Sequence, residues 1–269
     1  MLTNKIIGFI GGGNMAEALI RGLQAGGVPA AKLLVSEPVE ERRTFLCDRY
    51  GVIAMANNQA VAAACDVLIV AVKPQVATTA IAEFASSVKP DTLLISIMAG
   101  VKTGAIEAPF SGPVKVVRVM PNTPALVLTG ASALCAGSNA DADDLALARR
   151  ICELVGKAYV IDEKLMDAVT GLSGSGPAYV LTIIEALSDA GVKNGLSRDV
   201  ATGLAAQTLY GTARLLLETH EHPAVLKEKV TSPGGTTIAG LQVLEQRGLR
   251  GALMDAVDAA TVRSRELGK

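Results

Sequence analysis

Ile6-Ile7-Gly8-Phe9-Ile10-Gly11-Gly12-Gly13-Asn14-Met15-Ala16 is the stretch of this 269-residue chain that decides its fold. The apolar run at its start predicts a buried strand, and the residues from Met15 to Ala25 have the pattern of a helix. Gly11, Gly13 and Ala16 match the GxGxxA pattern. In this pattern the first glycine permits a tight turn, the second lets the backbone approach a pyrophosphate closely, and the small third residue lets the helix pack closely on the strand. The stretch therefore predicts a dinucleotide site whose phosphates meet the N–H groups at the helix start.

The strand–loop–helix unit is followed by further units of the same kind. Short β-branched or apolar runs alternate with longer amphipathic ones as far as about residue 160. The strands we expect after the first are 33–36, 67–72, 92–97, 114–120 and 131–136, with a helix over 40–50. Continuous apolar strands separated by helices predict a parallel sheet covered on both faces, the doubly wound α/β architecture of Rossmann-type domains.

The second part of the chain has only helical patterns. We expect helices over 164–172, 178–194, 197–219 and 249–267. The segment 178–187 is apolar most of the way round, so it needs burial on several sides, and in so small a domain another subunit would cover it. The sequence predicts a dinucleotide-binding domain over 1–162 and an all-helical dimerisation and substrate-binding domain over 163–269, assembled as a homodimer.

The composition excludes several classes of protein. Hydrophobic residues make up 50% of the chain and charged residues 19%, unlike disordered chains. A net charge of -1 and an aromatic content of 3% argue against a nucleic-acid partner or a charged membrane surface. Nothing in the pattern predicts a signal peptide or a span of about 18 apolar residues. The four cysteines lack CxxC spacing, so we expect buried thiols, no metal site and a cytoplasmic location.

The end of the second strand bears on the choice of cofactor. Ser36 stands where NAD-specific enzymes usually carry Asp or Glu, and a small hydroxyl leaves room for a 2′-phosphate. Arg42 or Arg43 would supply positive charge, while Glu37 is interpreted as a solvent-facing loop carboxylate. The residues thus favour NADP, with NAD as the alternative. Lys73 ends the third predicted strand and either borders the cofactor or is an ordinary surface lysine.

Two glycine-rich stretches interrupt the helical part, Leu172–Ala178 and Thr231–Thr237. Glycines just before a helix let successive N–H groups point into one concavity, which suits an anion such as a carboxylate. The alternative for both stretches is ordinary helix capping.

Taken together, the motifs closely resemble those of the pyrroline-5-carboxylate reductase family. They follow one another in the family's order over essentially the whole chain. They are Ile10–Ala16, Ala71–Pro74, Met120–Pro124, Asp167–Tyr179, and the pair formed by His222 to Lys227 and Thr231–Thr237.

This resemblance implies a Rossmann-type domain followed by a helical dimerisation domain whose dimers assemble further, in some members to decamers. It implies reduction of L-1-pyrroline-5-carboxylate to L-proline, the last step of proline biosynthesis. The implied NADP contacts are Gly11, Gly13, Asn14, Met15, Ala16, Ser36, Asn58, Ala71, Val72, Lys73 and Pro74. The implied substrate contacts are Ser232, Gly234, Gly235, Thr236 and Thr237, close to the turn Ser173–Pro177.

The reaction needs a hydride on the imine carbon and a proton on the ring nitrogen. Thr237 is our first candidate for the hydrogen bond to that nitrogen and Ser175 the second, although solvent remains a proton source because neither is a strong acid. Rival hypotheses are a β-hydroxyacid dehydrogenase using Lys164 or Lys193, another imine reductase, and a dinucleotide sensor without turnover. A six-membered cyclic imine also stays open as substrate, because one methylene contributes only about 1–3 kcal/mol of discrimination.

Overall fold

The computed structural model describes residues 2–268, which form two compact units. Unit 1 comprises the chain up to Ser175 together with the residues from Ala259 onwards, and unit 2 comprises Gly176–Asp258. The first unit contains the sheet, and the second is entirely helical. The unit boundary near Ser175 is a different division from the proposed functional one at 162/163, since unit 1 also takes in the helical residues 163–175.

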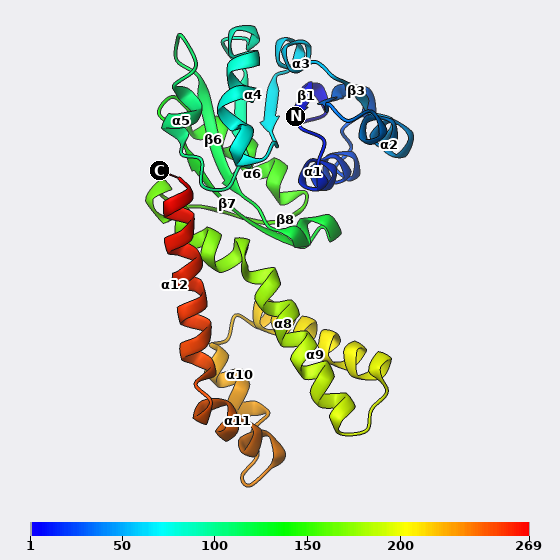
Figure 1. Ribbon diagram of the computed structural model, residues 1–269, viewed down its shortest axis with the longest axis vertical. Coiled ribbons are helices and arrows are strands. Elements are labelled where there is room, and N and C mark those ends of the chain that lie inside the picture. Colours follow the sequence, from blue (N-terminus) through cyan, green and yellow to red (C-terminus); the bar gives the residue numbers. More distant parts are fainter. Residues whose placement is uncertain (1, 269) are drawn as a thin grey trace. The chain divides into compact units, whose positions relative to one another are not determined.

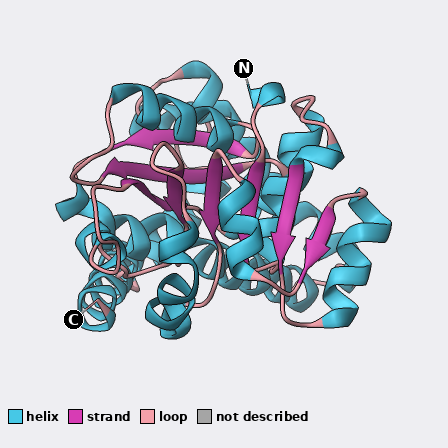
Figure 2. Cartoon of the chain, turned by 90° about the horizontal axis from the view of Figure 1, so that it is seen from above, coloured by secondary structure: helices cyan, strands magenta, loops and turns pink. Residues whose placement is uncertain are grey.

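One eight-stranded sheet forms the centre of unit 1 (Figure 2). Its spatial order is β3-β2-β1-β4-β5-β6-β7-β8, so the order reverses direction between β1 and β4. Such a reversal opens a crevice at the carboxyl ends of the strands, where doubly wound proteins bind ligands. The strands are β1 Ile7–Ile10, β2 Leu33–Ser36, β3 Ile53–Met55, β4 Val67–Val70, β5 Leu93–Ser96, β6 Lys115–Met120, β7 Gly130–Ala136 and β8 Gly156–Val160.

The sheet departs from the sequence prediction at its far side. β6 and β7 pair antiparallel, with Met120 opposite Ala133, whereas every other neighbouring pair is parallel. The connection 121–129 is too short for the crossover of about a dozen residues that parallel neighbours require. The prediction of an all-parallel sheet was therefore wrong for this one pair, although the doubly wound architecture is confirmed.

Helices cover both faces of the sheet. Because successive side chains of a strand point to opposite faces, the core beside β1 is divided into two apolar clusters, one on each face. Ile7 and Phe9 of β1 pack in one apolar cluster with α1 and α6. Ile10 packs in the other cluster with α3 and α4. The helices of this unit are α1 Asn14–Ala25, α2 Glu40–Tyr50, α3 Asn58–Ala64, α4 Ala77–Phe84, α5 Thr103–Glu107, α6 Ala142–Glu153 and α7 Met166–Val169. Because both faces are buried, the strands are continuous apolar runs, as the sequence indicated.

The predicted helix over 164–172 is three shorter pieces. A 3-10 turn, η6 (Glu163–Leu165), leads into α7, and a π-helical turn, η7 (Thr170–Gly174), follows it. Gly171 and Gly174 have no side chain to stabilise a regular helix at this point. π turns are rare and are frequently found at functional sites, and this one ends directly before Ser175.

Unit 2 consists of α8 Gly176–Lys193, α9 Arg198–Thr219, α10 Pro223–Lys229, α11 Thr236–Gln246 and the first part of α12 Leu249–Leu267. α8 and α9 lie side by side (Figure 1), joined by the hydroxyls of Ser188 and Thr202 at 2.7 Å. The unit has almost no core of its own: within it, Ala201 and Ala205 are the buried hydrophobic residues. Leu181 is 64% exposed and Met254 68% exposed, although both are large and apolar.

Within residues 2–268, we find no helix whose length and hydropathy would let it span a bilayer. The same residues contain no cluster of three or more His, Cys, Asp or Glu side chains that could hold a metal ion. Cys65, Cys135 and Cys152 are buried, as predicted, whereas Cys47 is only half-buried. Burial raises the pKa of Cys65 and Cys152 to about 12, so both remain thiols at neutral pH and are poor nucleophiles.

Candidate active site

The glycine loop lies at the carboxyl ends of three neighbouring strands. The Gly11 N–H donates to the Ser36 carbonyl at 2.8 Å, and the Ala71 N–H donates to the Ile10 carbonyl at 2.8 Å. These bonds join the end of β1 to the ends of β2 and β4. The sequence-predicted residues of the phosphate loop, of Ser36 and of the Ala71–Pro74 segment therefore do come together at one edge of the sheet.

The two outer glycines of the loop are required for different reasons. Gly11 has φ +95°, and a Cβ there would lie 2.8 Å from the Ala71 carbonyl oxygen. Gly13 has φ -68°, which any residue adopts, and a Cβ there would meet nothing within 4 Å. The space next to Gly13 is open, and α1 begins directly behind it at Asn14 without a side-chain cap. The N–H groups of the first turn of α1 thus have no side-chain cap, as an anion site at a helix start requires.

Glu37 is not the solvent-facing carboxylate that the sequence suggested. Its Oε2 accepts from the Gly12 N–H at 2.8 Å, and its Oε1 accepts from the Val39 N–H at 3.0 Å. A backbone N–H has no sequence signature, so this partnership appears only in the fold. Glu37 holds the glycine loop against the end of β2.

Arg42 and Arg43, predicted as a source of charge for a 2′-phosphate, both have partners within the chain. Arg42 donates to the Gly12 carbonyl at 2.6 Å and pairs with Glu17 at 2.5 Å. Arg43 donates to the carbonyls of Glu37 and Pro38, both at 2.8 Å. Both guanidinium groups therefore bind parts of the chain itself.

A pocket of about 380 Å³ opens beyond the ends of β1, β2 and β4. In it the Ser36 hydroxyl donates to Asn58 Oδ1 at 2.7 Å, and Asn58 Nδ2 donates to Glu83 Oε2 at 2.6 Å. Ser36 and Asn58, both predicted to contact the cofactor, are thus in direct contact. Glu83, the third residue of this hydrogen-bonded series, was not predicted from the sequence. The pocket is lined by Gly11, Ser36, Pro38, Ala56, Asn58, Val72, Val76, Thr79, Ala80 and Glu83.

A second pocket, of about 340 Å³, lies on the other side of the segment that follows β4. The 3-10 turn η3 (Pro74–Val76) has Val76 in the first pocket and Pro74 in the second. Lys73 precedes this turn with its side chain exposed. The second pocket is lined by Pro74, Gln75, Ala99, Gly100, Val101, Thr170, Ser175, Ala260, Arg263, Ser264 and Leu267. The two pockets flank η3, an arrangement suited to a long ligand with different chemistry at its two ends.

The π turn positions Ser175 at the second pocket. The Ser175 N–H donates to the Thr170 carbonyl at 2.9 Å, which closes the turn. Asn122 donates from Nδ2 to the Ser173 carbonyl at 3.1 Å and accepts from the Ala131 N–H at 2.8 Å. The asparagine of the Met120–Pro124 motif therefore ties the π turn to β7, a structural role that the motif alone did not reveal.

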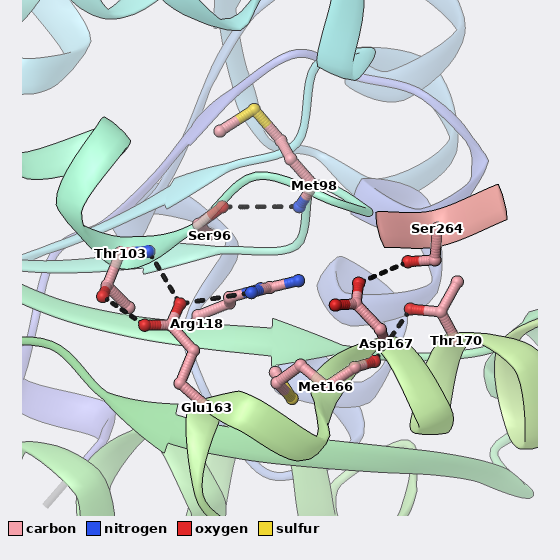
Figure 3. Close-up of polar contacts among 9 residues, drawn as sticks. All are labelled: Ser96, Met98, Thr103, Arg118, Glu163, Met166, Asp167, Thr170 and Ser264. Carbon is pink, nitrogen blue, oxygen red and sulfur yellow. Dashed lines mark hydrogen bonds and ion pairs between the residues drawn. The ribbon is translucent and has the colours of Figure 1, made fainter. Parts of the chain in front are cut away.

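Two groups of polar contacts, one at Glu163 and one at Asp167, fix the elements around the second pocket (Figure 3). The Glu163 carboxylate accepts from the Thr103 N–H and hydroxyl, both at 2.8 Å, and from Arg118 at 3.1 Å. The Ser264 hydroxyl donates to Asp167 Oδ1 at 2.7 Å, joining α12 to α7. Burial alone would raise the pKa of Glu163, but the hydrogen bonds from Thr103 and Arg118 outweigh it and hold the pKa below its usual value. Glu163 is therefore an anchoring carboxylate and not a proton donor.

The predicted substrate residues lie in unit 2, between α10 and α11. Gly234 has φ +65°, and the Gly235 N–H donates to the Ser232 carbonyl at 3.1 Å. α11 begins at Thr236, and its N-cap residue Gly235 has no side chain to satisfy the first N–H groups. The loop thus has the form that an anion-binding concavity needs. Ser175 belongs to unit 1 and Thr237 to unit 2.

Comparison with known proteins shows the family to which this chain is related. Residues 163–267 match the model of the pyrroline-5-carboxylate reductase dimerisation domain, and residues 6–100 match that of the coenzyme F420-dependent NADP oxidoreductases. A pyrroline-5-carboxylate reductase of Synechocystis is 49% identical over 264 residues, which cover 98% of each chain. This chain belongs to the pyrroline-5-carboxylate reductase family.

Solved structures of pyrroline-5-carboxylate reductases have the same fold. That of Coxiella burnetii superposes with a TM-score of 0.93 at 37% identity, covering 98% of this chain and 99% of the other. That of Plasmodium falciparum, solved with NADP bound, gives a TM-score of 0.89 at 35% identity, covering 99% of each chain. The predicted resemblance and the predicted architecture, a Rossmann-type domain followed by a mostly helical dimerisation domain, are both confirmed.

Proposed function

We propose that this chain reduces L-1-pyrroline-5-carboxylate to L-proline, the last step of proline biosynthesis, in the cytoplasm. Membership in the reductase family supports the reaction, and the NADP-oxidoreductase match over residues 6–100 supports the cofactor. The observation that carries the proposal is the uncapped start of α1 behind Gly13, at the switch point of the sheet and beside the pocket that Gly11 lines.

The residues around this edge fit a nicotinamide dinucleotide. The open space at Gly13 would be filled by any Cβ, and the uncapped helix start at Asn14 and Met15 would receive a pyrophosphate, with the small Ala16 packed behind it. Ser36 and Asn58 would contact the adenosine end, and Ala71, Val72, Lys73 and Pro74 would border the middle of the cofactor. When bound, the nicotinamide supplies the hydride that the C=N bond accepts.

The loop from Ser232 to Thr237 would hold the substrate carboxylate. Its backbone N–H groups and the hydroxyls of Thr236 and Thr237 are donors, and an N-terminal helix end favours a negative charge. Gly234 and Gly235 let the backbone form this concavity without side chains in the way. Anchoring the carboxylate fixes which face of the ring is presented for reduction.

The ring nitrogen needs a hydrogen-bonding partner because an iminium accepts hydride better than a neutral imine. We propose Thr237 for this role, with Ser175 as the second candidate. Neither hydroxyl makes a hydrogen bond within the described part of the chain, so each is available to a ligand. Among the described residues that line the second pocket, Arg263 is the one with a titratable side chain, and an arginine does not give up its proton. Solvent is therefore the source of the proton, and the hydroxyl positions the protonated ring.

We propose a homodimer formed through unit 2, from which larger assemblies such as decamers are built. The match of residues 163–267 to a dimerisation model supports it. So do the large apolar side chains that unit 2 leaves exposed, such as Leu181, Leu217 and Met254, because a soluble monomer rarely leaves so much apolar surface uncovered.

A steady-state assay tests the reaction. Purified protein is mixed with racemic pyrroline-5-carboxylate and NADPH or NADH, the loss of reduced-cofactor absorbance is followed, and the product is identified by amino-acid analysis. We expect oxidation with both cofactors and proline as the product. Folded protein that binds NADPH but oxidises neither cofactor would contradict the proposed function while leaving the dinucleotide site intact.

A further inference from the structure

The pocket beyond β2 contains a carboxylate that no part of the proposed function uses. Glu83 lies on α4 and is the one charged side chain among the residues that line this pocket. Arg42 and Arg43, the nearby cations expected to balance a phosphate, are bound to carbonyl oxygens and to Glu17 instead. Among the described residues, the charged side chain that lines this pocket is thus a carboxylate, and neither arginine lines it.

Glu83 also controls the direction of the neighbouring donors. Its Oε2 accepts from Asn58 Nδ2 at 2.6 Å, and Asn58 Oδ1 in turn accepts from the buried Ser36 hydroxyl at 2.7 Å. The Ser36 hydroxyl proton and one of the two Asn58 amide protons are thereby directed along the hydrogen-bonded series Ser36–Asn58–Glu83. A second bond fixes the same region, since Gln59 Nε2 donates to the Glu83 carbonyl at 2.9 Å.

NAD-specific enzymes of this fold place a carboxylate at the end of the second strand, where it binds the ribose hydroxyls. Here that position is Ser36, and the next residue, Glu37, is bound to backbone N–H groups. The acidic group that faces the pocket comes from α4. A free ribose 2′-hydroxyl could donate to a carboxylate at this place, whereas a 2′-phosphate would meet a like charge.

We propose that Glu83 is the residue that sets the cofactor preference of this enzyme, by opposing the 2′-phosphate and by holding Asn58 toward itself. This inference rests on the dinucleotide-binding part of the proposed function and not on the identity of the reduced substrate. The pocket accepts both cofactors, and Glu83 limits the advantage of NADPH over NADH. Glu83 acts as a positioning and specificity residue and takes no part in the chemistry.

The test measures binding of 2′,5′-ADP and of 5′-AMP by calorimetry, because these two fragments differ only in the 2′-phosphate and need no turnover. Glu83→Gln keeps an acceptor for Asn58 and removes the charge. We expect the affinity for 2′,5′-ADP to rise about 3–30-fold, with the affinity for 5′-AMP unchanged, as for one like charge removed near the phosphate in a solvent-exposed site. The increase should shrink at high ionic strength.

Asp91→Asn is the matched control. It removes the same charge at an exposed position before the amino end of β5, the opposite edge of the parallel sheet from the pocket. We expect it to alter neither affinity. In the turnover assay, Glu83→Gln should raise the ratio of kcat/KM with NADPH to kcat/KM with NADH by a similar factor.

Two results would overturn the inference: an unchanged ratio of the two fragment affinities in Glu83→Gln, or the same shift of that ratio in Asp91→Asn. Failure of the proposed reaction is a separate result. It would appear as fragment binding that responds to Glu83→Gln in a protein that does not reduce pyrroline-5-carboxylate.

Discussion

Gly13→Val should weaken binding of the cofactor while leaving the stability of the fold almost unchanged. The φ of -68° at Gly13 suits valine, and an added Cβ meets nothing within 4 Å. The stability of the fold should change by no more than about 1 kcal/mol, the scale of a changed helix N-cap. The same side chain would occupy the open space at the start of α1, where a pyrophosphate has to approach the backbone.

The size of the effect on binding follows from the contacts that would be lost. Displacing the phosphates from two N–H groups removes two charge-assisted hydrogen bonds of about 1.5–3 kcal/mol each. The Kd for NADPH should therefore rise about 10²–10⁴-fold. Calorimetric titration with NADPH, next to urea unfolding of the same protein, gives both quantities.

Gly11→Ala is the comparison within the same loop. Its φ of +95° and the contact at 2.8 Å with the Ala71 carbonyl oxygen predict a loss of stability of at least about 1–2 kcal/mol. Gly13→Val with wild-type affinity for NADPH would refute our account of the phosphate loop. Gly11→Ala with wild-type stability would refute the explanation of that glycine.

Further predictions concern the substrate loop and the buried anchor. Thr237→Ala should lower kcat/KM about 10–100-fold, because it removes one hydrogen bond of about 1.5–3 kcal/mol. Thr231→Ala, in the same loop, is the control and should keep most of the activity. Wild-type steady-state kinetics for Thr237→Ala would remove that residue from the mechanism. Glu163→Gln should lower stability, because Arg118 is buried and would lose its anionic partner. The folded-state pKa of Glu163 lies below the value of 4.5 for a free carboxyl, so its contribution is present above that pH and is lost as the pH falls through the folded-state pKa. The difference in unfolding free energy between wild type and Glu163→Gln should thus be constant near neutral pH and diminish in acid; a difference that grows in acid would have the wrong sign.

The buried strands and the glycine loop could be predicted because their signals are local. Apolar runs such as Val67–Val70 are buried on both faces, so every residue carries the pattern. The two strands that were not predicted from the sequence, β3 and β8, lie at the edges of the sheet. β3 has only three residues, with Ile53 45% exposed, and in β8 Tyr159 is 56% exposed. A half-exposed short strand leaves no continuous apolar run.

The site was harder to predict where a side chain binds a distant part of the chain. Glu37 contacts Gly12 and Asn58 contacts Glu83, and both pairs are 25 residues apart. Such partners are brought together by the sheet order, which local periodicity does not encode. The glycines at 11 and 13, by contrast, could be predicted because they belong to one short local motif. Gly11 adopts a φ of +95°, and Gly13 leaves open the space that a side chain would fill.

Isotope transfer tests whether a hydride passes from the nicotinamide to the imine carbon of pyrroline-5-carboxylate. The enzyme is given pyrroline-5-carboxylate with NADPH deuterated at the transferred position of C4, and the product is analysed by mass spectrometry. We predict proline with one deuterium at C5. Unlabelled proline, or no proline from folded enzyme that binds NADPH, would contradict the account.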